Sequence, residues 1–92
     1  MSVFTKTGIK KTKFKLRAPE ARNVSLTGDF QSWSSEGIPM RKSWAGVWNV
    51  GLDLPPGTYQ YKFIVDGDWW TDPKNGHISD SDIGSINSVI KV

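Results

Sequence analysis

The sequence contains no cysteine, only one histidine, and no apolar run long enough to cross a membrane. Without cysteine there is no disulfide framework, no thiolate nucleophile and no cysteine-based zinc site. Small exported domains commonly depend on disulfides, so this absence favours the cytoplasm. A transmembrane helix needs about 20 apolar residues, and the N-terminus lacks the apolar stretch of a signal peptide. We therefore expect a cytoplasmic protein that does not bind membranes.

Residues suited to catalysis are also scarce. His77 has no neighbour at the spacing of a metal pair or of a serine–histidine dyad. Asp80 and Asp82 resemble a fragment of a calcium loop, but the closing glutamate of such a loop is missing. The carboxylates of residues 66–72 would need a deep cleft to raise one of their pKa values, and a domain this small offers none. We expect no enzyme activity, no metal and no cofactor.

The 92 residues are sufficient for one domain, and their net charge of +3 is unevenly distributed. Residues 1–17 hold six basic side chains and no acid, whereas residues 18–92 hold six basic and nine acidic side chains. The leading segment is therefore +6 and the remainder is −3. An acidic body disfavours nucleic acid as a partner, because it repels phosphate.

Apolar and polar residues alternate with a period of two along most of the chain, and no amphipathic pattern of helix length appears. In the clearest strand, residues 59–65, the aromatic side chains point to one face and Lys62 to the other. Asp66 and Gly67 then supply the two positive-φ positions of a tight hairpin turn. We predict an all-β, immunoglobulin-like (early set) sandwich of six to eight short antiparallel strands over residues 12–92, after a flexible or loosely attached segment, 1–11. Strands are predicted at 13–17, 23–27, 48–54, 59–65, 69–71 and 86–92, and a long polar loop at 74–84.

Five tryptophans exceed what the core of so small a domain requires. Trp48 is in phase with the apolar residues of its strand and is predicted to be buried, whereas Trp33 lies in a polar stretch. Trp69 and Trp70 are adjacent in an extended segment, so they face opposite ways and at most one enters the core. The hairpin turn brings the outward one to the face of Lys62. An exposed indole beside a hydrogen-bonding cation suits a sugar, although the pattern equally permits tryptophans packed beneath loops.

Four blocks of sequence occur in an order typical of a known family. They are LTGDFQSW at 26–33, LPPGTYQYKFIVDGDW at 54–69, DP at 72–73 and GSINSVI at 84–90. Over residues 13–92 the chain resembles family 48 carbohydrate-binding modules. These include the glycogen-binding domain of the AMP-activated protein kinase β subunit and the N-terminal domains of branching and debranching enzymes.

The resemblance implies a non-catalytic module that binds α-1,4-linked glucan, such as glycogen, starch or cyclodextrin. Trp70 departs from the family, which often has a small or polar residue there, and it either extends the sugar platform or fills a gap beneath a loop. The loop before Gly84 is about one residue longer than in the kinase domain, which leaves the reach of Ile83 open. The implied sugar contacts are two stacking tryptophans, three polar side chains and an apolar prong, namely Trp33, Trp69, Lys62, Ser85, Asn87 and Ile83.

The residues are also compatible with two other functions. The domain could serve as a protein-interaction or scaffold domain of a larger glucan-processing enzyme or kinase complex, with its exposed aromatics as the interface. Binding of single-stranded nucleic acid would use the basic stretch 10–17 together with aromatic stacking. This last function is disfavoured, because the basic residues lie far in sequence from the tryptophans.

Overall fold

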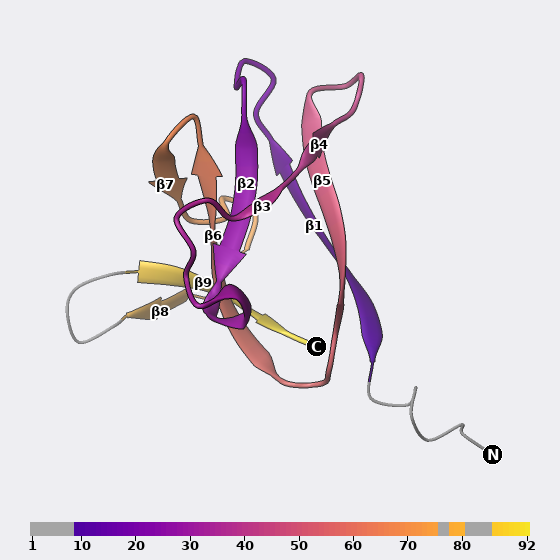
Figure 1. Ribbon diagram of the computed structural model, residues 1–92, viewed down its shortest axis with the longest axis vertical. Coiled ribbons are helices and arrows are strands. Elements are labelled where there is room, and N and C mark those ends of the chain that lie inside the picture. The colour runs from indigo at the N-terminus through magenta and orange to yellow at the C-terminus, as the bar shows by residue number, and fades with distance from the viewer. Residues whose placement is uncertain (1–8, 76–77, 81–85) are drawn as a thin grey trace.

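Two antiparallel β-sheets pack face to face in the computed structural model, which describes residues 9–75, 78–80 and 86–92 (Figure 1). The smaller sheet has the strand order β1–β5–β4. The larger has the order β3–β2–β6–β9–β8, with β7 also paired to β6. The described residues contain one 3-10 turn, η2, and no α-helix, which confirms the predicted all-β sandwich. The strands are β1 Lys10–Arg17, β2 Val24–Gly28, β3 Ile38–Pro39, β4 Arg41–Lys42, β5 Val47–Leu54, β6 Thr58–Val65, β7 Asp68–Trp70, β8 Ile78–Asp80 and β9 Ile86–Lys91; η2 is Asp29–Gln31.

The structure contains three short strands that were not predicted, because an alternating pattern does not reveal them. β3 and β4 have two residues each, too few for a period of two to be recognised. The predicted loop at 74–84 is wrong in part, because it contains β8, which pairs with residues 86–88 of β9. Main-chain pairing along the edge of β9 extends this polar segment even though its side chains carry no strand pattern.

The core lies between the sheets and consists of the inward side chains of both. Phe14 of β1 and Phe63 of β6 are 3% and 0% exposed, and Tyr61 makes edge-to-face contacts with both rings. Trp48 is buried as predicted, and its Nε1–H donates a 2.9 Å hydrogen bond to the carbonyl of Ala18. The remaining buried apolar core residues are Leu16, Ala18, Val24, Leu26, Met40, Leu54 and Val65.

The turn between β6 and β7 has the predicted geometry. Asp66 and Gly67 adopt φ values of 49° and 92°, as a two-residue hairpin turn requires. The Asp66 carboxylate also accepts hydrogen bonds from the main-chain amides of Arg22 (2.9 Å) and Asn23 (2.8 Å). The amide of Asp66 in turn donates to the carbonyl of Asn23 at 2.9 Å. The turn that precedes Trp69 is thereby attached to the β1–β2 connection.

Residues 1–8, 76–77 and 81–85 lie outside the described part of the chain. Most of the predicted N-terminal segment 1–11 is among them, while residues 10 and 11 belong to β1. Within the described part, no helix has the length and hydropathy of a membrane span.

Candidate functional site

The outer face of the larger sheet brings together most of the residues predicted from the sequence. Directly opposed residues of antiparallel strands share a face, and the register pairs Thr27 with Lys62 and Ile64 with Trp69. The β6–β9 register pairs Tyr61 with Ser88, and one further step along both strands places Asn87 across from Lys62. Lys62, Trp69 and Asn87 therefore lie on one face, and they come from three neighbouring strands.

The chain leaves β2 by a close passage over β6. A Cβ added at Gly28 would lie 2.4 Å from the carbonyl oxygen of Gln60 and 2.6 Å from the ring of Phe30, so only glycine fits there. The Asp29 carboxylate accepts a 3.2 Å hydrogen bond from the amide of Gln60. Gly28 and Asp29, both in the first sequence block, thus fix where the following loop begins.

This loop turns Trp33 back over the sheet. The amide of Trp33 donates to the carbonyl of Gly28 at 2.9 Å, and the Thr27 hydroxyl donates to the carbonyl of Ser34 at 2.8 Å. Ser32 and Trp33 both have φ values of 53°, a left-handed conformation that costs a non-glycine residue about 1 kcal/mol or more. Thr27 points outward from the sheet but is fully buried, because the loop covers it. Its hydroxyl is therefore part of the support for Trp33.

Trp33 and Trp69 form a pair on this face. Their ring centroids are 6.5 Å apart and their planes are inclined by 32°. Trp69 is 43% exposed and Trp33 is half-buried, so the pair is supported from below and open to solvent. Ile64, opposite Trp69 in the register, is only 8% exposed although it points outward. Two inclined indoles with an apolar floor present a surface that complements a curved apolar ligand face.

Polar groups lie beside the aromatic pair. Lys62 is half-buried, and none of the described residues accepts a hydrogen bond from its ammonium or forms an ion pair with it. Asn87 is 9% exposed, and its Nδ2 donates a 2.9 Å hydrogen bond to Oε1 of Gln60. Gln60 was not among the site residues predicted from the sequence. The sequence signal for Gln60 was its position two residues before Lys62 in the same strand, which places both side chains on one face.

Two of the predicted contacts, Ile83 and Ser85, lie outside the described residues, as does the lone histidine His77. Ile83 and Ser85 belong to the connection between β8 and β9, and β9 provides Asn87. Their roles stay predictions from the family resemblance.

The structure separates the other two exposed tryptophans from this face. Trp70 is paired with the core residue Phe63, so it points to the inner side of the larger sheet and does not extend the Trp33–Trp69 pair. It is nevertheless 41% exposed. Trp44, for which the sequence pattern gave no prediction, is 99% exposed in the turn between β4 and β5. Its signal was its place between two predicted strands, among the small residues Ser43, Ala45 and Gly46.

Two of the carboxylates considered for catalysis, those of Asp66 and Asp72, have structural partners. Asp72 accepts a 2.7 Å hydrogen bond from the hydroxyl of Tyr61, and its amide donates to Oγ of Ser88 at 2.7 Å. Burial raises the pKa of Tyr61, so the hydroxyl stays protonated at neutral pH. The residues that the structure describes contain no group of three acidic, histidine or cysteine side chains placed to hold a metal ion.

Comparisons with known proteins match most of the chain to one family. A family model described as the glycogen recognition site of AMP-activated protein kinase matches residues 10–92. The chain is 39% identical over 71 residues to the beta-1 subunit of 5′-AMP-activated protein kinase from Sus scrofa, which covers 77% of this chain and 55% of that protein. It is 41% identical to the Bos taurus beta-1 subunit and 42% identical to the Mus musculus beta-2 subunit, again over 71 residues. These matches cover a quarter of either relative, so the chain spans only part of their length.

Proposed function

This chain belongs to the family of glycogen recognition sites of AMP-activated protein kinase, and we propose that it is a non-catalytic module that binds α-1,4-linked glucan such as glycogen, starch or cyclodextrin. The observation that supports the proposal best is the inclined pair of Trp33 and Trp69 on an outward sheet face. Such a pair offers separate platforms to consecutive glucose units of a coiled chain. A flat ribbon of sugar would suit it less.

Each tryptophan contributes by covering the apolar C–H face of a pyranose. Removing about 60–100 Å² of apolar surface from water stabilises the complex by about 1.5–2.5 kcal/mol per ring. The ammonium of Lys62 donates hydrogen bonds to sugar hydroxyls, and the side-chain amides of Asn87 and Gln60 form hydrogen bonds with other hydroxyls of the sugar. With the entropy of association set against these contacts, the dissociation constant falls between about micromolar and millimolar.

Ile83 and Ser85 complete the proposed site. The connection that contains them joins β8 to β9, and β9 begins at Ile86, one residue before Asn87. In this proposal Ile83 enters the curve of the glucan and Ser85 hydrogen-bonds to a hydroxyl. A long polymer engages several modules at once, so weak single sites are sufficient.

The module binds glucan without transforming it. The Asp66 and Asp72 carboxylates accept hydrogen bonds from main-chain amides and from Tyr61, so neither forms part of an acid–base pair. Glucan binding and the absence of cysteine both fit a cytoplasmic location.

A second candidate function is docking to a kinase or a glucan-processing enzyme. The outer face of the smaller sheet carries the exposed cations Lys11, Lys13, Lys15 and Arg17, which form no ion pair with other described residues. A basic surface of this kind attracts an acidic protein face. Capture of the partner protein in the presence of excess maltodextrin would support this function. If maltodextrin abolishes the capture, the two proteins are held together only by binding the same glucan, and this function is refuted.

Isothermal titration with maltoheptaose tests the main proposal. We expect saturable binding by the native chain and binding weakened by about tenfold or more in Trp69→Ala, with circular dichroism used to verify that the variant is folded. Trp44→Ala is the matched control, because it removes an equally large indole far more exposed than Trp69. Failure of the native chain to bind, or equal binding by folded Trp69→Ala, would refute the proposal.

A further inference from the structure

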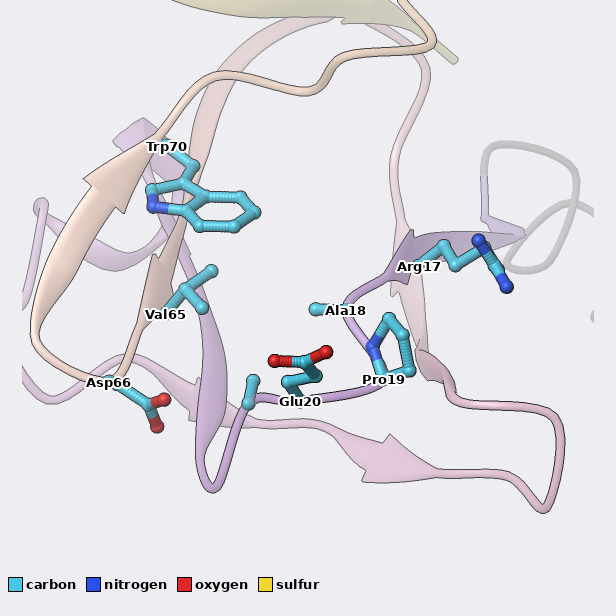
Figure 2. A pocket seen from close by; sticks show the side chains of 8 residues that line it. Arg17, Ala18, Pro19, Glu20, Val65, Asp66 and Trp70 are labelled. Carbon is cyan, nitrogen blue, oxygen red and sulfur yellow. The ribbon is translucent and has the colours of Figure 1, made fainter.

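The two tryptophans of β7 face opposite sides of the strand, and Trp70 borders a hollow of its own. This hollow has a volume of about 380 Å³ and lies where the β1–β2 connection meets the end of β6 (Figure 2). Figure 1 shows this end of the molecule at the top, where the β1–β2 connection and the β6–β7 turn lie close together. Val65 forms the floor beneath the indole, and Ala18 and Pro19 form the opposite wall.

The hollow combines one large apolar surface with hydrogen-bond acceptors. The carboxylate of Glu20 points into it and has no hydrogen bond or ion pair to another described residue. The Asp66 carboxylate is held in place by the amides of Arg22 and Asn23. Its Oδ1 accepts two good bonds while Oδ2 accepts one longer bond of 3.2 Å, so Oδ2 keeps capacity for a further donor. The guanidinium of Arg17 points away from the hollow in Figure 2.

We propose that this hollow is a second hexose subsite, in which one glucose unit stacks on Trp70 and its hydroxyls donate to the carboxylates of Glu20 and Asp66. The proposal rests on the proposed glucan function and extends it. A 380 Å³ hollow falls within the range of small-ligand sites and accommodates a single sugar ring. An aromatic platform with acceptors at its edge is the chemistry that a neutral polyol requires.

An ammonium group would also suit an indole flanked by carboxylates. The hexose is favoured because Trp70 follows Trp69 directly, and consecutive Cα atoms are only about 3.8 Å apart. A glucan held on the Trp69 side therefore raises the local concentration of neighbouring chains and branches beside Trp70. The module would then bind two glucan chains of one glycogen particle, one on each side of β7.

The test follows the indole N–H signals of the five tryptophans by nuclear magnetic resonance during titration with maltotriose. In the native chain we expect the signals of Trp33, Trp69 and Trp70 to shift, and that of Trp44 to stay. In the double variant Trp33→Ala with Trp69→Ala, we expect the Trp70 signal still to shift and to saturate. Glu20→Ala should weaken this remaining binding about three- to tenfold, which is the expected effect of one lost hydrogen bond. Glu36→Ala removes an exposed glutamate elsewhere and should leave it unchanged.

The outcomes separate the two proposals. If no indole signal of the native chain shifts, the glucan function itself fails. If Trp33 and Trp69 respond but Trp70 does not, the second subsite is refuted and the glucan function stands. Saturation of the Trp70 signal by tetramethylammonium but not by maltotriose would also refute the hexose subsite and assign the hollow to a cation. Because Glu20 is exposed and outside the core, Glu20→Ala leaves the fold intact and tests the subsite directly.

Discussion

The two outward faces of the sandwich arise from the same strand alternation but differ in chemistry. On the larger sheet, the outward positions carry Trp69, Lys62 and Asn87, with Trp33 placed over them by a loop. On the smaller sheet, the outward positions of β1 are occupied by the series of cations that begins at Lys11. A neutral polyol suits the first face and an anion suits the second. The period of two decides which residues face outward, and residue type decides what each face can bind.

Ligand binding at the two faces should also depend differently on salt concentration. Contacts between exposed charges weaken over a Debye length of about 8–10 Å at physiological ionic strength. Stacking of sugar on indole involves no net charge and is insensitive to this screening. Glucan binding that hardly changes with salt would therefore locate the ligand on the aromatic face, whereas steep salt dependence would point to the cationic face.

Removing an indole from the aromatic face should produce the largest effect. Trp69→Ala is expected to weaken maltoheptaose binding by about tenfold or more, because about 2 kcal/mol of apolar contact is lost. Titration calorimetry at two salt concentrations measures this change. Unaltered affinity in a folded Trp69→Ala protein would contradict the assignment of glucan binding to the aromatic face.

A smaller effect is expected from the support beneath Trp33. Thr27→Val keeps the shape of a fully buried side chain but removes the hydroxyl that donates to Ser34. The unpaired carbonyl should lower the free energy of unfolding by about 1–2 kcal/mol, and a looser Trp33 should weaken glucan binding about threefold. Urea unfolding and calorimetry measure the two effects. Ser25→Ala, on the same face of β2, is the control and should change neither by as much.

Tyr61 lies in the core between the two faces, and its hydroxyl should make the protein less stable at alkaline pH. Burial raises the pKa of Tyr61 above its ordinary value of about 10, so the hydroxyl loses its proton more readily in the unfolded chain. Its contribution to stability is therefore complete below about pH 10 and is lost as the pH rises further. Urea midpoints should be similar at pH 8 and 9 and should fall between pH 10 and 11. The fall should be shallower in Tyr61→Phe, and an equal slope in both proteins would contradict the assignment.

The smallest effect on glucan binding is expected from reversing charge on the cationic face. The double change of Lys13 and Lys15 to glutamate should alter maltoheptaose affinity by less than about twofold, since both side chains are on the opposite sheet. The same variant should elute earlier from a heparin column, because anion binding depends on these cations. A tenfold loss of glucan affinity would show that sugar reaches this face.

Sequence reasoning succeeded where local rules determine the structure. The alternation in β1, β5 and β6 predicted which side chains are buried, and Asp66–Gly67 predicted a turn with two positive φ values. It failed for β8, whose pairing depends on the neighbouring edge of β9.

Within the candidate site, the resemblance to a known family indicated the residues, but it did not supply their support. Trp33 is held by left-handed conformations at two non-glycine residues, which no propensity favours. The burial of Thr27 results from the loop that covers it and could not be inferred from its strand position. The adjacency of Trp69 and Trp70 predicted opposite sides, yet the hollow beside Trp70 depends on the distant β1–β2 connection.

The Asp66 carboxylate has a consequence for motion. It joins the β6–β7 turn to the amides of Arg22 and Asn23, more than 40 positions earlier in the chain. Neither segment can open without releasing the other, so the two loops fluctuate as one cooperative unit. Amide protons on both sides of that link should exchange with solvent at a common rate. A sugar that restrains the tryptophans of β7 would then slow exchange at Arg22 and Asn23, which it never contacts.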